Sequence, residues 1–438
     1  MNRLPDEILL LIVDNIYLHR DKRNFLLVCR RWRSVLYKSV NRNVWINGGC
    51  IRPLVLAIHD NPALGSAIQS LRLHWWSSYT RKAENHDITP VIPLVAQISQ
   101  SEEETKEWEE ALKEGNQDAW LGLLLLSLEN LIELDMHYTW NPIFLRRVIS
   151  RAAMREYPLD TKPVLQRLEA FYVDASDDNK AYFPSVEFLP FFRLPSMRTV
   201  SLDSVVESLH REIDHPAFKA SRGTSPIVSL AFDRHSNGSK GMAEFITSCA
   251  NLEQFEYSHS NQAIWGEQYI SFRPRAFYTA LCSQKHSLQV IHLDDTDELT
   301  GAESDEEDPN DLPDNWLGSF ADFNKLWDLQ VSVANLLNFH KSDQVPRVSS
   351  LKEILPRSLK RLHLGRFQIS QLDLVRSNLL EVVACREEFP HLEQLELETG
   401  FKQLIQQESG PPLTIKQALA PLIDACEDVG IKMTIVRW

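Results

Sequence analysis

The sequence lacks an apolar run long enough to span a bilayer. The stretch at residues 8–13 has six apolar residues, whereas a spanning helix needs about 18 or more. Asp6 and Glu7 precede this stretch and Asp14 follows it, although a signal peptide carries positive charge at that place and avoids acids. We therefore expect neither a membrane partner nor a secretion signal.

Closely spaced cysteines are also missing. The six cysteines lie at positions 29, 50, 249, 282, 385 and 426, so no pair forms a C-x-x-C unit. This spacing predicts reduced, mostly buried thiols rather than a disulfide framework or a zinc site. Reduced thiols are typical of a cytoplasmic protein, a nuclear protein or both. His210, Asp214 and His215 could share a helix face as metal ligands, but solvated side chains are the simpler interpretation.

The chain has little positive charge and no catalytic signature. Lys and Arg together number 46 against 60 Asp and Glu, for a net charge of −14, and this balance argues against a nucleic-acid partner. Phosphate-binding glycine loops, nucleophile elbows and H-E-x-x-H are all missing. We predict that the protein is not an enzyme and needs no cofactor. Residues 1–45 differ from the rest, with nine basic and four acidic side chains, so the two parts are expected to meet different partners.

The first 45 residues predict short amphipathic helices. Pro5 suits the first turn of a helix, and Ile8, Ile12 and Ile16 recur every four residues. A second helix is expected to begin after Asp21 and to present one apolar face, formed by Phe25, Val28, Cys29, Trp32, Val35 and Leu36. So small a segment cannot bury all of this surface. The excess must dock on the rest of the chain or on a partner.

The segment "LPDEILLLIVDNI" followed by "LLVCRRWRSV" resembles the F-box motif, an LP-x-E-I helix and then V-C-[KR]-x-W. The resemblance covers about residues 2–45, and the entry "RDKRNFLL" departs from the usual leucine-rich form. It implies that the segment binds the Skp-type adaptor of a cullin–RING ubiquitin ligase. The residues expected to make this contact are Leu4, Pro5, Ile8, Leu9, Ile12, Val28, Cys29 and Trp32. The alternative is that they close a helical core within this chain.

The remaining chain repeats one short pattern, apolar-x-x-apolar-x-apolar. Nine clear copies begin at positions 68, 131, 197, 227, 252, 288, 326, 359 and 392, and one of ambiguous register lies within 165–173. Such strands resemble those of leucine-rich repeats, here with long and irregular units. We therefore predict an α/β protein: a helical F-box domain at 1–45, then a degenerate leucine-rich-repeat solenoid at 46–438. A curved parallel sheet would carry its helices on the convex side.

Two acidic segments interrupt the repeats. Residues 99–117 predict a helix in which Trp108, Ala111 and Leu112 share a face, and which forms a solvated insertion or a lid over the solenoid edge. Residues 294–314 carry eleven acidic side chains and no basic one, a composition typical of a disordered loop. Within it, Ser304 precedes three acidic residues and is a candidate phosphorylation site.

The concave sheet face is the candidate substrate-binding surface. In each repeat the third, fifth and seventh positions point away from the core, because strand side chains alternate. The residues predicted to bind substrate are Glu133, Asp135, Asp203, Asp233, Glu256, Glu396 and Glu398, with Trp75 and Trp140 behind the first strands. This set favours a protein target rich in Lys or Arg. Alternatively, the carboxylates only keep an exposed sheet soluble.

These observations predict the substrate receptor of a Skp–cullin–F-box ubiquitin ligase, in which the adaptor links the chain to a cullin–RING ligase. Two alternatives remain open from the sequence. One is a scaffold that binds the adaptor without causing degradation. The other is a receptor that senses a small ligand within the repeats.

Overall fold

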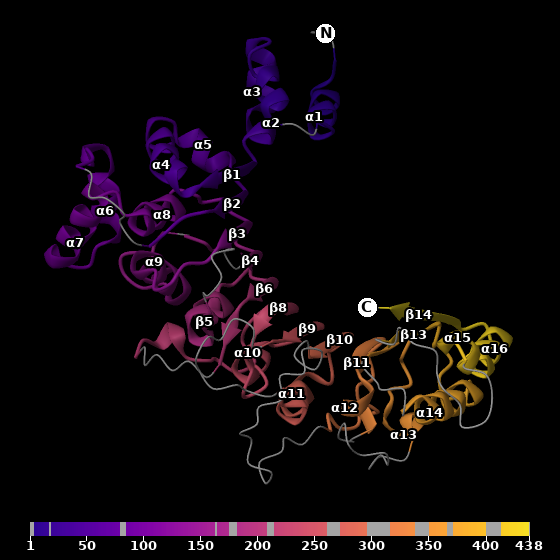
Figure 1. The fold of residues 1–438 in the computed structure, drawn as a ribbon. Coiled ribbons are helices and arrows are strands. Elements are labelled where there is room, and N and C mark those ends of the chain that lie inside the picture. The colour runs from indigo at the N-terminus through magenta and orange to yellow at the C-terminus, as the bar shows by residue number, and fades with distance from the viewer. Residues whose placement is uncertain are drawn as a thin grey trace. The chain divides into compact units, whose positions relative to one another are not determined.

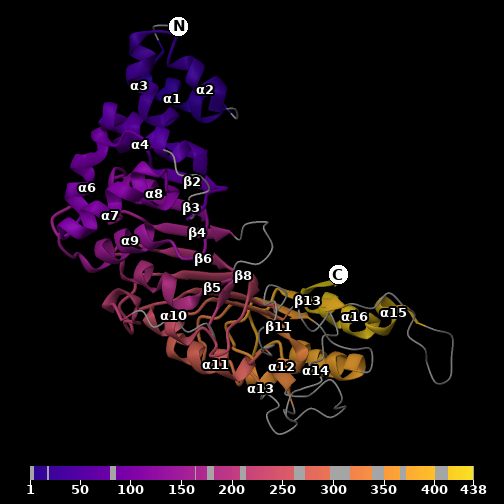
Figure 2. The same ribbon diagram turned by 60° about the vertical axis from the view of Figure 1, so that its left-hand side comes forward.

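The computed structural model describes residues 4–16, 19–78, 85–162, 164–174, 182–207, 214–260, 272–295, 316–337, 350–365, 371–399 and 413–437. The chain divides into two compact units, whose elements are labelled in Figures 1 and 2. The first unit comprises residues Met1–Ala181, Val186–Leu202 and Glu212–Lys219, and the second comprises Tyr182–Ser185, Asp203–Arg211 and Ala220–Trp438. None of the described helices has the length and apolar character needed to cross a bilayer.

The first unit opens with three short helices, α1 (Asp6–Asp14), α2 (His19–Phe25) and α3 (Arg30–Val40). The predicted single helix after Asp21 is wrong, because the chain leaves the helical conformation between α2 and α3. Three successive turn hydrogen bonds end α2, and Cys29 is extended, with φ −163° and ψ 168°. Leu27 and Val28 therefore lie in a turn rather than on a helix face.

A small apolar core holds these helices together. Its fully buried members are Leu9, Val13, Trp32, Leu36 and Val40. The ring of Phe25 stacks on that of Trp32 with a centroid distance of 5.2 Å. Arg31 adds a polar contact, because its Nη2 donates to the Leu4 carbonyl and to Asp6 Oδ1, each at 2.6 Å. The start of α1 is thus fixed to α3.

The sheet of the first unit is parallel, and its strands pair in the order β1, β2, β3, β4, β6. The strands are β1 (Asn43–Asn47), β2 (Ser70–His74), β3 (Glu133–His137), β4 (Ala170–Asp174) and β6 (Thr199–Asp203). The predicted strands at 68, 131 and 197 are confirmed, and β4 fixes the register within 165–173. Strand β1 lacks the repeat pattern and was missed; it crosses the boundary placed between residues 45 and 46.

Helices lie along one face of these strands (Figures 1 and 2). They are α4 (Ile51–Asp60), α5 (Pro62–Ala67), α6 (Ile92–Ile98), α7 (Glu102–Lys113), α8 (Gln117–Leu126) and α9 (Ile143–Met154), with 3-10 turns at Gly48–Cys50, Thr89–Val91, Ser185–Arg193 and Pro216–Phe218. Alternate strand side chains such as Leu71, Leu73 and Leu134 are completely buried. The side chains between them lie on the opposite face of the sheet.

The acidic segment at 99–117 forms the predicted helix, α7, but it is not a solvated insertion. Trp108 and Leu112 are completely buried, and the Trp108 ring lies 4.5 Å from that of Phe144. Glu104 Oε1 accepts a hydrogen bond from Arg151 Nη1 at 2.7 Å. Burial opposes ionisation of Glu104, but the contacts with Arg151, the Gln100 N–H and the charge of Arg147 together outweigh it and lower the pKa of the carboxyl. The expectation of a solvated segment fails because Trp108 and Leu112 pack inside and Glu104 pairs with the buried Arg151.

The second unit repeats the same construction. Its parallel strands are β8 (Ser229–Ser236), β9 (Gln254–His259), β10 (Val290–Asp295), β11 (Asp328–Ser332), β12 (Arg361–Gly365), β13 (Gln394–Thr399) and β14 (Lys432–Arg437), and a short pair joins β5 (Phe183–Pro184) to β7 (Val205–Val206). Its helices are α10 (Ala243–Ser248), α11 (Pro274–Leu281), α12 (Val333–Leu337), α13 (Leu351–Ile354), α14 (Leu372–Ala384), α15 (Ile415–Ala418) and α16 (Ala420–Asp428), with a 3-10 turn at Cys282–Gln284.

The predicted strands from 227 onward are all confirmed, whereas β14 was missed. Ser304 and most of the acidic segment 294–314 lie outside the described residues. The predicted α/β architecture, N-terminal helices followed by strand-and-helix repeats on a parallel sheet, is confirmed.

Asp118 links two neighbouring repeats and makes stability depend on pH. Its carboxylate accepts the backbone N–H groups of Phe144 at 2.8 Å and Leu145 at 2.9 Å, at the start of α9. The side chain is buried, and burial raises its pKa from 3.8 to about 6. The folded state therefore binds this proton more tightly than the unfolded chain does. The resulting stability is complete below pH 3.8 and is lost as the pH rises through about 6.

We expect Asp118→Asn to remove this pH dependence, because the amide does not titrate. A difference of about two pKa units corresponds to about 3 kcal/mol. The fall in unfolding free energy between pH 4 and 7 should shrink by about that amount, measured by urea unfolding at several pH values. Asp322→Asn is the control, because the Asp322 carboxylate is exposed. Solvent screens its ion pair with Lys285 Nζ, which is 3.5 Å away. Equal pH slopes in wild type and Asp118→Asn would contradict the assignment.

Candidate protein-interaction surfaces

Helix α1 has two apolar sides. Leu9 and Val13, one turn apart, are buried in the helical core. Ile8, Leu11 and Ile12 lie on another side and are exposed by 40, 59 and 38%. Pro5, just before the helix, is also exposed. We call Pro5, Ile8, Leu11 and Ile12 the α1 stripe. A stripe of exposed aliphatic side chains on a helix is typical of a surface that packs against another helix.

The turn between α2 and α3 exposes two further aliphatic side chains. Leu27 is 82% exposed and Val28 is 57% exposed. Both follow the last turn of α2, where the backbone hydrogen bonds shorten to i→i+3. The break in the predicted helix thus moves them out of the core and into solvent.

The eight residues predicted to contact the adaptor fall into three groups. Pro5, Ile8, Ile12 and Val28 are exposed, and Leu4 and Cys29 are half-buried against the helical core. Leu9 and Trp32 are corrections to the predicted surface: they are 1 and 4% exposed and form that core instead. Three short helices have few large side chains, so these two are needed inside.

Sequence reasoning missed two exposed aliphatic side chains. Leu11 had a signal, because it lies three residues after Ile8. Leu27 had none, because its exposure depends on where the helix breaks.

The first unit presents a row of aromatic and charged side chains on the sheet face opposite its helices. Register places Trp45, Arg72, Asp135 and Tyr172 side by side on β1 to β4. Trp45 is 73% exposed. Arg72 Nε lies 2.7 Å from Asp135 Oδ2, while Glu133, also on β3, forms no ion pair with a described residue. Burial and then the neighbouring Glu133 and Asp135 raise the pKa of Tyr172.

An aromatic cluster lies where β2 and β3 end. Trp75 is 60% exposed and its ring lies 5.4 Å from that of His137. His137 Nε2 is 2.7 Å from His74 Nδ1 and 3.6 Å from Asp174 Oδ2. Trp140 follows β3 and is 38% exposed.

The backbone fixes Trp75 in this position. Its φ of 53° is unusual for a residue other than glycine. The Trp75 carbonyl accepts a hydrogen bond from Gly48 N at 3.2 Å. A Cβ at Gly48 would lie 2.9 Å from that carbonyl oxygen, so the close approach requires glycine. Such constrained conformations are often found at functional positions.

In the second unit, the acids of the same face have partners on the next strand. His292 lies 3.9 Å from Glu256 and 3.4 Å from Asp328. Asp328 also pairs with Arg361, whose guanidinium lies 5.0 Å from the Trp327 ring. His363 lies 3.9 Å from Glu396 and 3.5 Å from Glu398. Several acids expected to bind a basic target, namely Glu256, Glu396 and Glu398, therefore already have a histidine of the neighbouring strand beside them.

Asp233 and Asp203, two further acids predicted to bind substrate, differ in their exposure. Asp233 is exposed as expected. Asp203 is only 6% exposed, and Ser204 Oγ donates to its Oδ1 at 3.2 Å. Strand alternation fails there because β6 ends and the chain turns through Ser204, whose φ is 59°.

The suggested metal ligands do not form a site among the described residues. No group of three His, Cys, Asp or Glu side chains there is placed to hold a metal ion. His215 Nδ1 instead accepts the Ala217 N–H at 3.2 Å, and its Nε2 lies 3.3 Å from Glu156. His210 lies outside the described residues.

Comparison with protein-family models finds two matches. Residues 49–404 match the leucine-rich repeat domain, and residues 1–45 match the F-box-like domain. Domains of these two kinds typically mediate protein interactions without catalysing a reaction, and F-box domains in general bind a Skp-type adaptor. No curated protein matches the chain.

Proposed function

Because this chain belongs to the leucine-rich repeat family and carries an F-box-like domain at residues 1–45, we propose that it is the substrate receptor of a Skp–cullin–F-box ubiquitin ligase. The helical segment holds the adaptor, and the repeats hold the target protein. In this role the chain itself catalyses nothing. It raises the effective concentration of the target near the ubiquitin-conjugating enzyme. This effective concentration depends on the geometry that joins the two binding sites.

The α1 stripe carries the proposal. Its aliphatic side chains are exposed although a second set on the same helix already fills the helical core. Burying one such side chain contributes about 1.5–3 kcal/mol. The stripe together with Leu27 and Val28 can outweigh an association cost of about 4–15 kcal/mol. A surface of this kind suits the apolar face of a partner helix.

The sheet face of the first unit, opposite its helices, is the proposed target surface. Trp45 and Trp75 are among the most exposed large hydrophobic side chains of the described residues, and Glu133 forms no ion pair with a described residue. Aromatic faces and carboxylates together attract Lys and Arg side chains through cation–π and ion-pair contacts. The target is therefore a protein segment with several basic residues.

Affinity capture of the full chain tests the ligase role. We expect the adaptor and a cullin to purify together with it, and a target to accumulate when the proteasome is inhibited. Capture of the adaptor without a cullin would favour the non-degradative scaffold. Capture of neither would contradict the proposal.

The cysteines bear on where the protein works. All six are free, which suits a reducing compartment. We expect the tagged full chain in the cytoplasm, the nucleus or both, and its retention in the secretory pathway would contradict this expectation.

A basic peptide probes the proposed target surface. We expect octa-arginine to bind the full chain more weakly as salt rises from about 50 to about 150 mM. The Debye length shortens over this range, so exposed ion pairs are screened more strongly. Trp75→Ala should weaken binding about 3- to 10-fold, and Glu133→Gln should reduce the salt dependence. Both are measured by fluorescence anisotropy. Glu102→Gln is the control, because Glu102 is exposed on α7 rather than on the sheet. Binding that is insensitive to salt would rule out the electrostatic mechanism.

A further inference from the structure

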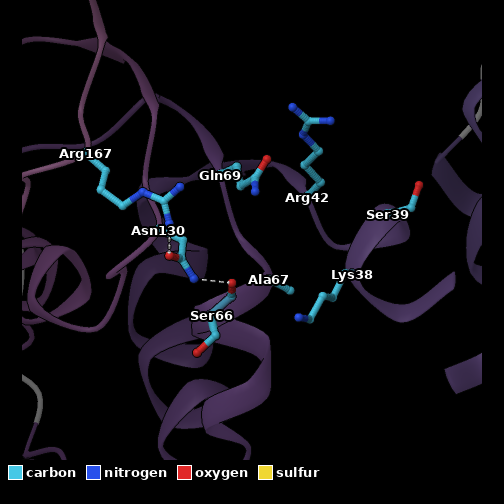
Figure 3. A pocket seen from close by; sticks show the side chains of 8 residues that line it. All are labelled: Lys38, Ser39, Arg42, Ser66, Ala67, Gln69, Asn130 and Arg167. Atoms are coloured by element: carbon cyan, nitrogen blue, oxygen red, sulfur yellow. Dashed lines mark hydrogen bonds between the residues drawn. The ribbon is translucent and has the colours of Figure 1, made fainter. Parts of the chain in front are cut away.

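A basic pocket lies at the edge of the first unit where its strands begin. Its volume is about 380 Å³, within the size range of small-ligand clefts. The lining residues, all labelled in Figure 3, are Lys38, Ser39, Arg42, Ser66, Ala67, Gln69, Asn130 and Arg167. This edge is opposite to the one at which Trp75 follows β2.

Parallel strands bring these residues together. Arg42, Gln69 and Arg167 each precede a strand, namely β1, β2 and β4. Because parallel strands begin at the same edge of a sheet, residues distant in sequence meet there. The Arg42 carbonyl accepts the N–H groups of Gln69 and Ser70 at 2.8 and 3.0 Å, which fixes the two strand entries. Lys38 comes from the last turn of α3.

Every charged side chain that lines the pocket is a cation. Lys38, Arg42 and Arg167 are exposed, and none forms an ion pair with a described carboxylate. Arg167 Nη1 donates to Asn130 Oδ1 at 2.6 Å, and Asn130 Nδ2 donates to the Ser66 carbonyl at 2.8 Å. Figure 3 shows Gln69 between Arg167 and Arg42.

The pocket gathers positive charge on a protein that is acidic overall. The protein has a net charge of −14, and some arginines of the first unit, such as Arg31 and Arg72, pair with aspartates. Asp14 contacts the pocket lining, because its Oδ1 accepts a hydrogen bond from Ser39 Oγ at 2.9 Å. Asp14 forms no ion pair with Lys38, Arg42 or Arg167 among the described residues.

We propose that this pocket binds a phosphate group carried by a phosphoserine or phosphothreonine of a partner protein. A phosphate monoester carries a charge of about −1.5 to −2 and three acceptor oxygens, which suits three cations from three separate elements. Arginine also offers paired donors to phosphate oxygens. A nucleic acid fits less well, because it needs an extended basic surface and the chain is acidic overall. The inference does not depend on adaptor or target binding.

Calorimetric titration of the full chain with a small phosphopeptide tests the site. The probe is acetyl-glycyl-phosphoseryl-glycine amide, the reference is the same peptide with unmodified serine, and ionic strength is held constant. We expect saturable one-to-one binding of the phosphopeptide alone. Arg42→Gln and Arg167→Gln should each weaken it about tenfold through the loss of a charge-assisted hydrogen bond. Arg33→Gln, an exposed position on α3 outside the pocket, should leave it unchanged.

Several results would overturn the proposal. These are the absence of saturable binding, equal weakening by Arg33→Gln, or tighter binding of inorganic phosphate or of a single-stranded oligonucleotide than of the phosphopeptide. Thermal unfolding of each variant shows whether it folds. If an arginine variant fails to fold, Lys38→Gln at the exposed end of α3 replaces it, with the same tenfold loss expected. Retained binding in Lys38→Gln would then count against the site.

Discussion

Ile8→Glu should weaken binding of the Skp-type adaptor by about 100-fold while the chain stays folded. Ile8 is 40% exposed at the middle of the α1 stripe, so the change removes none of the helical core. Adaptor binding would lose the burial of one large aliphatic side chain, about 1.5–3 kcal/mol. The substitution would also place an unpaired carboxylate in an apolar contact with the adaptor. Surface plasmon resonance with immobilised adaptor measures the loss.

Ile92→Glu is the matched control for this prediction. Ile92 belongs to the repeats and is 42% exposed, so the same substitution alters a similar side chain outside the helical segment. Its adaptor affinity should equal that of the wild type. Adaptor binding by Ile8→Glu within a factor of about three of wild type, a difference below 1 kcal/mol, would mean that the α1 stripe is not the docking surface.

Trp32→Ala should unfold the three N-terminal helices and abolish adaptor binding. Trp32 is 4% exposed and stacks on Phe25. Truncating a buried tryptophan costs about 3–5 kcal/mol, and so small a core supplies only a few kcal/mol in total. Hydrogen exchange at the amides of α1 and α3 should rise to the rate of an unfolded chain, while the repeats remain protected.

Trp45→Ala separates this effect from the mere loss of a tryptophan. Trp45 lies on the neighbouring strand β1 but is 73% exposed. Exchange in the helices should stay at the wild-type rate in this variant. If Trp32→Ala kept protected helices but lost adaptor binding, Trp32 would belong to the docking surface after all, and its placement in the core would be wrong.

Ile8 and Trp32 also show how much of the helical segment could be predicted from the sequence. The spacing of its apolar residues identified α1 and the side chains that must be buried, either within the chain or against a partner. The spacing did not separate Leu9 and Trp32, which the segment covers itself, from Ile8 and Ile12, which it leaves exposed. Both sets follow helical periodicity. The packing of three helices around a common core decides which set is inside.

The repeats were more predictable because their signal is local. The apolar-x-x-apolar-x-apolar pattern located the strands at nine positions, since every strand buries alternate side chains. Strands β1 and β14 were missed because they end the array and lack the full pattern. The pairing of Glu256 and Asp328 with His292 could not be predicted, because it depends on which residues face each other across neighbouring strands.

The sequence by itself determined the kinds of domain, the positions of most strands and the excess of apolar surface at the N-terminus. These features follow from periodic burial within short segments. The tertiary structure alone decided which aliphatic side chains remain exposed, which carboxylates are neutralised and that Lys38, Arg42 and Arg167 line one pocket. The packing of the three N-terminal helices decides the first of these features. The parallel sheet decides the other two, because it places residues from distant segments side by side at the same edge or in the same row.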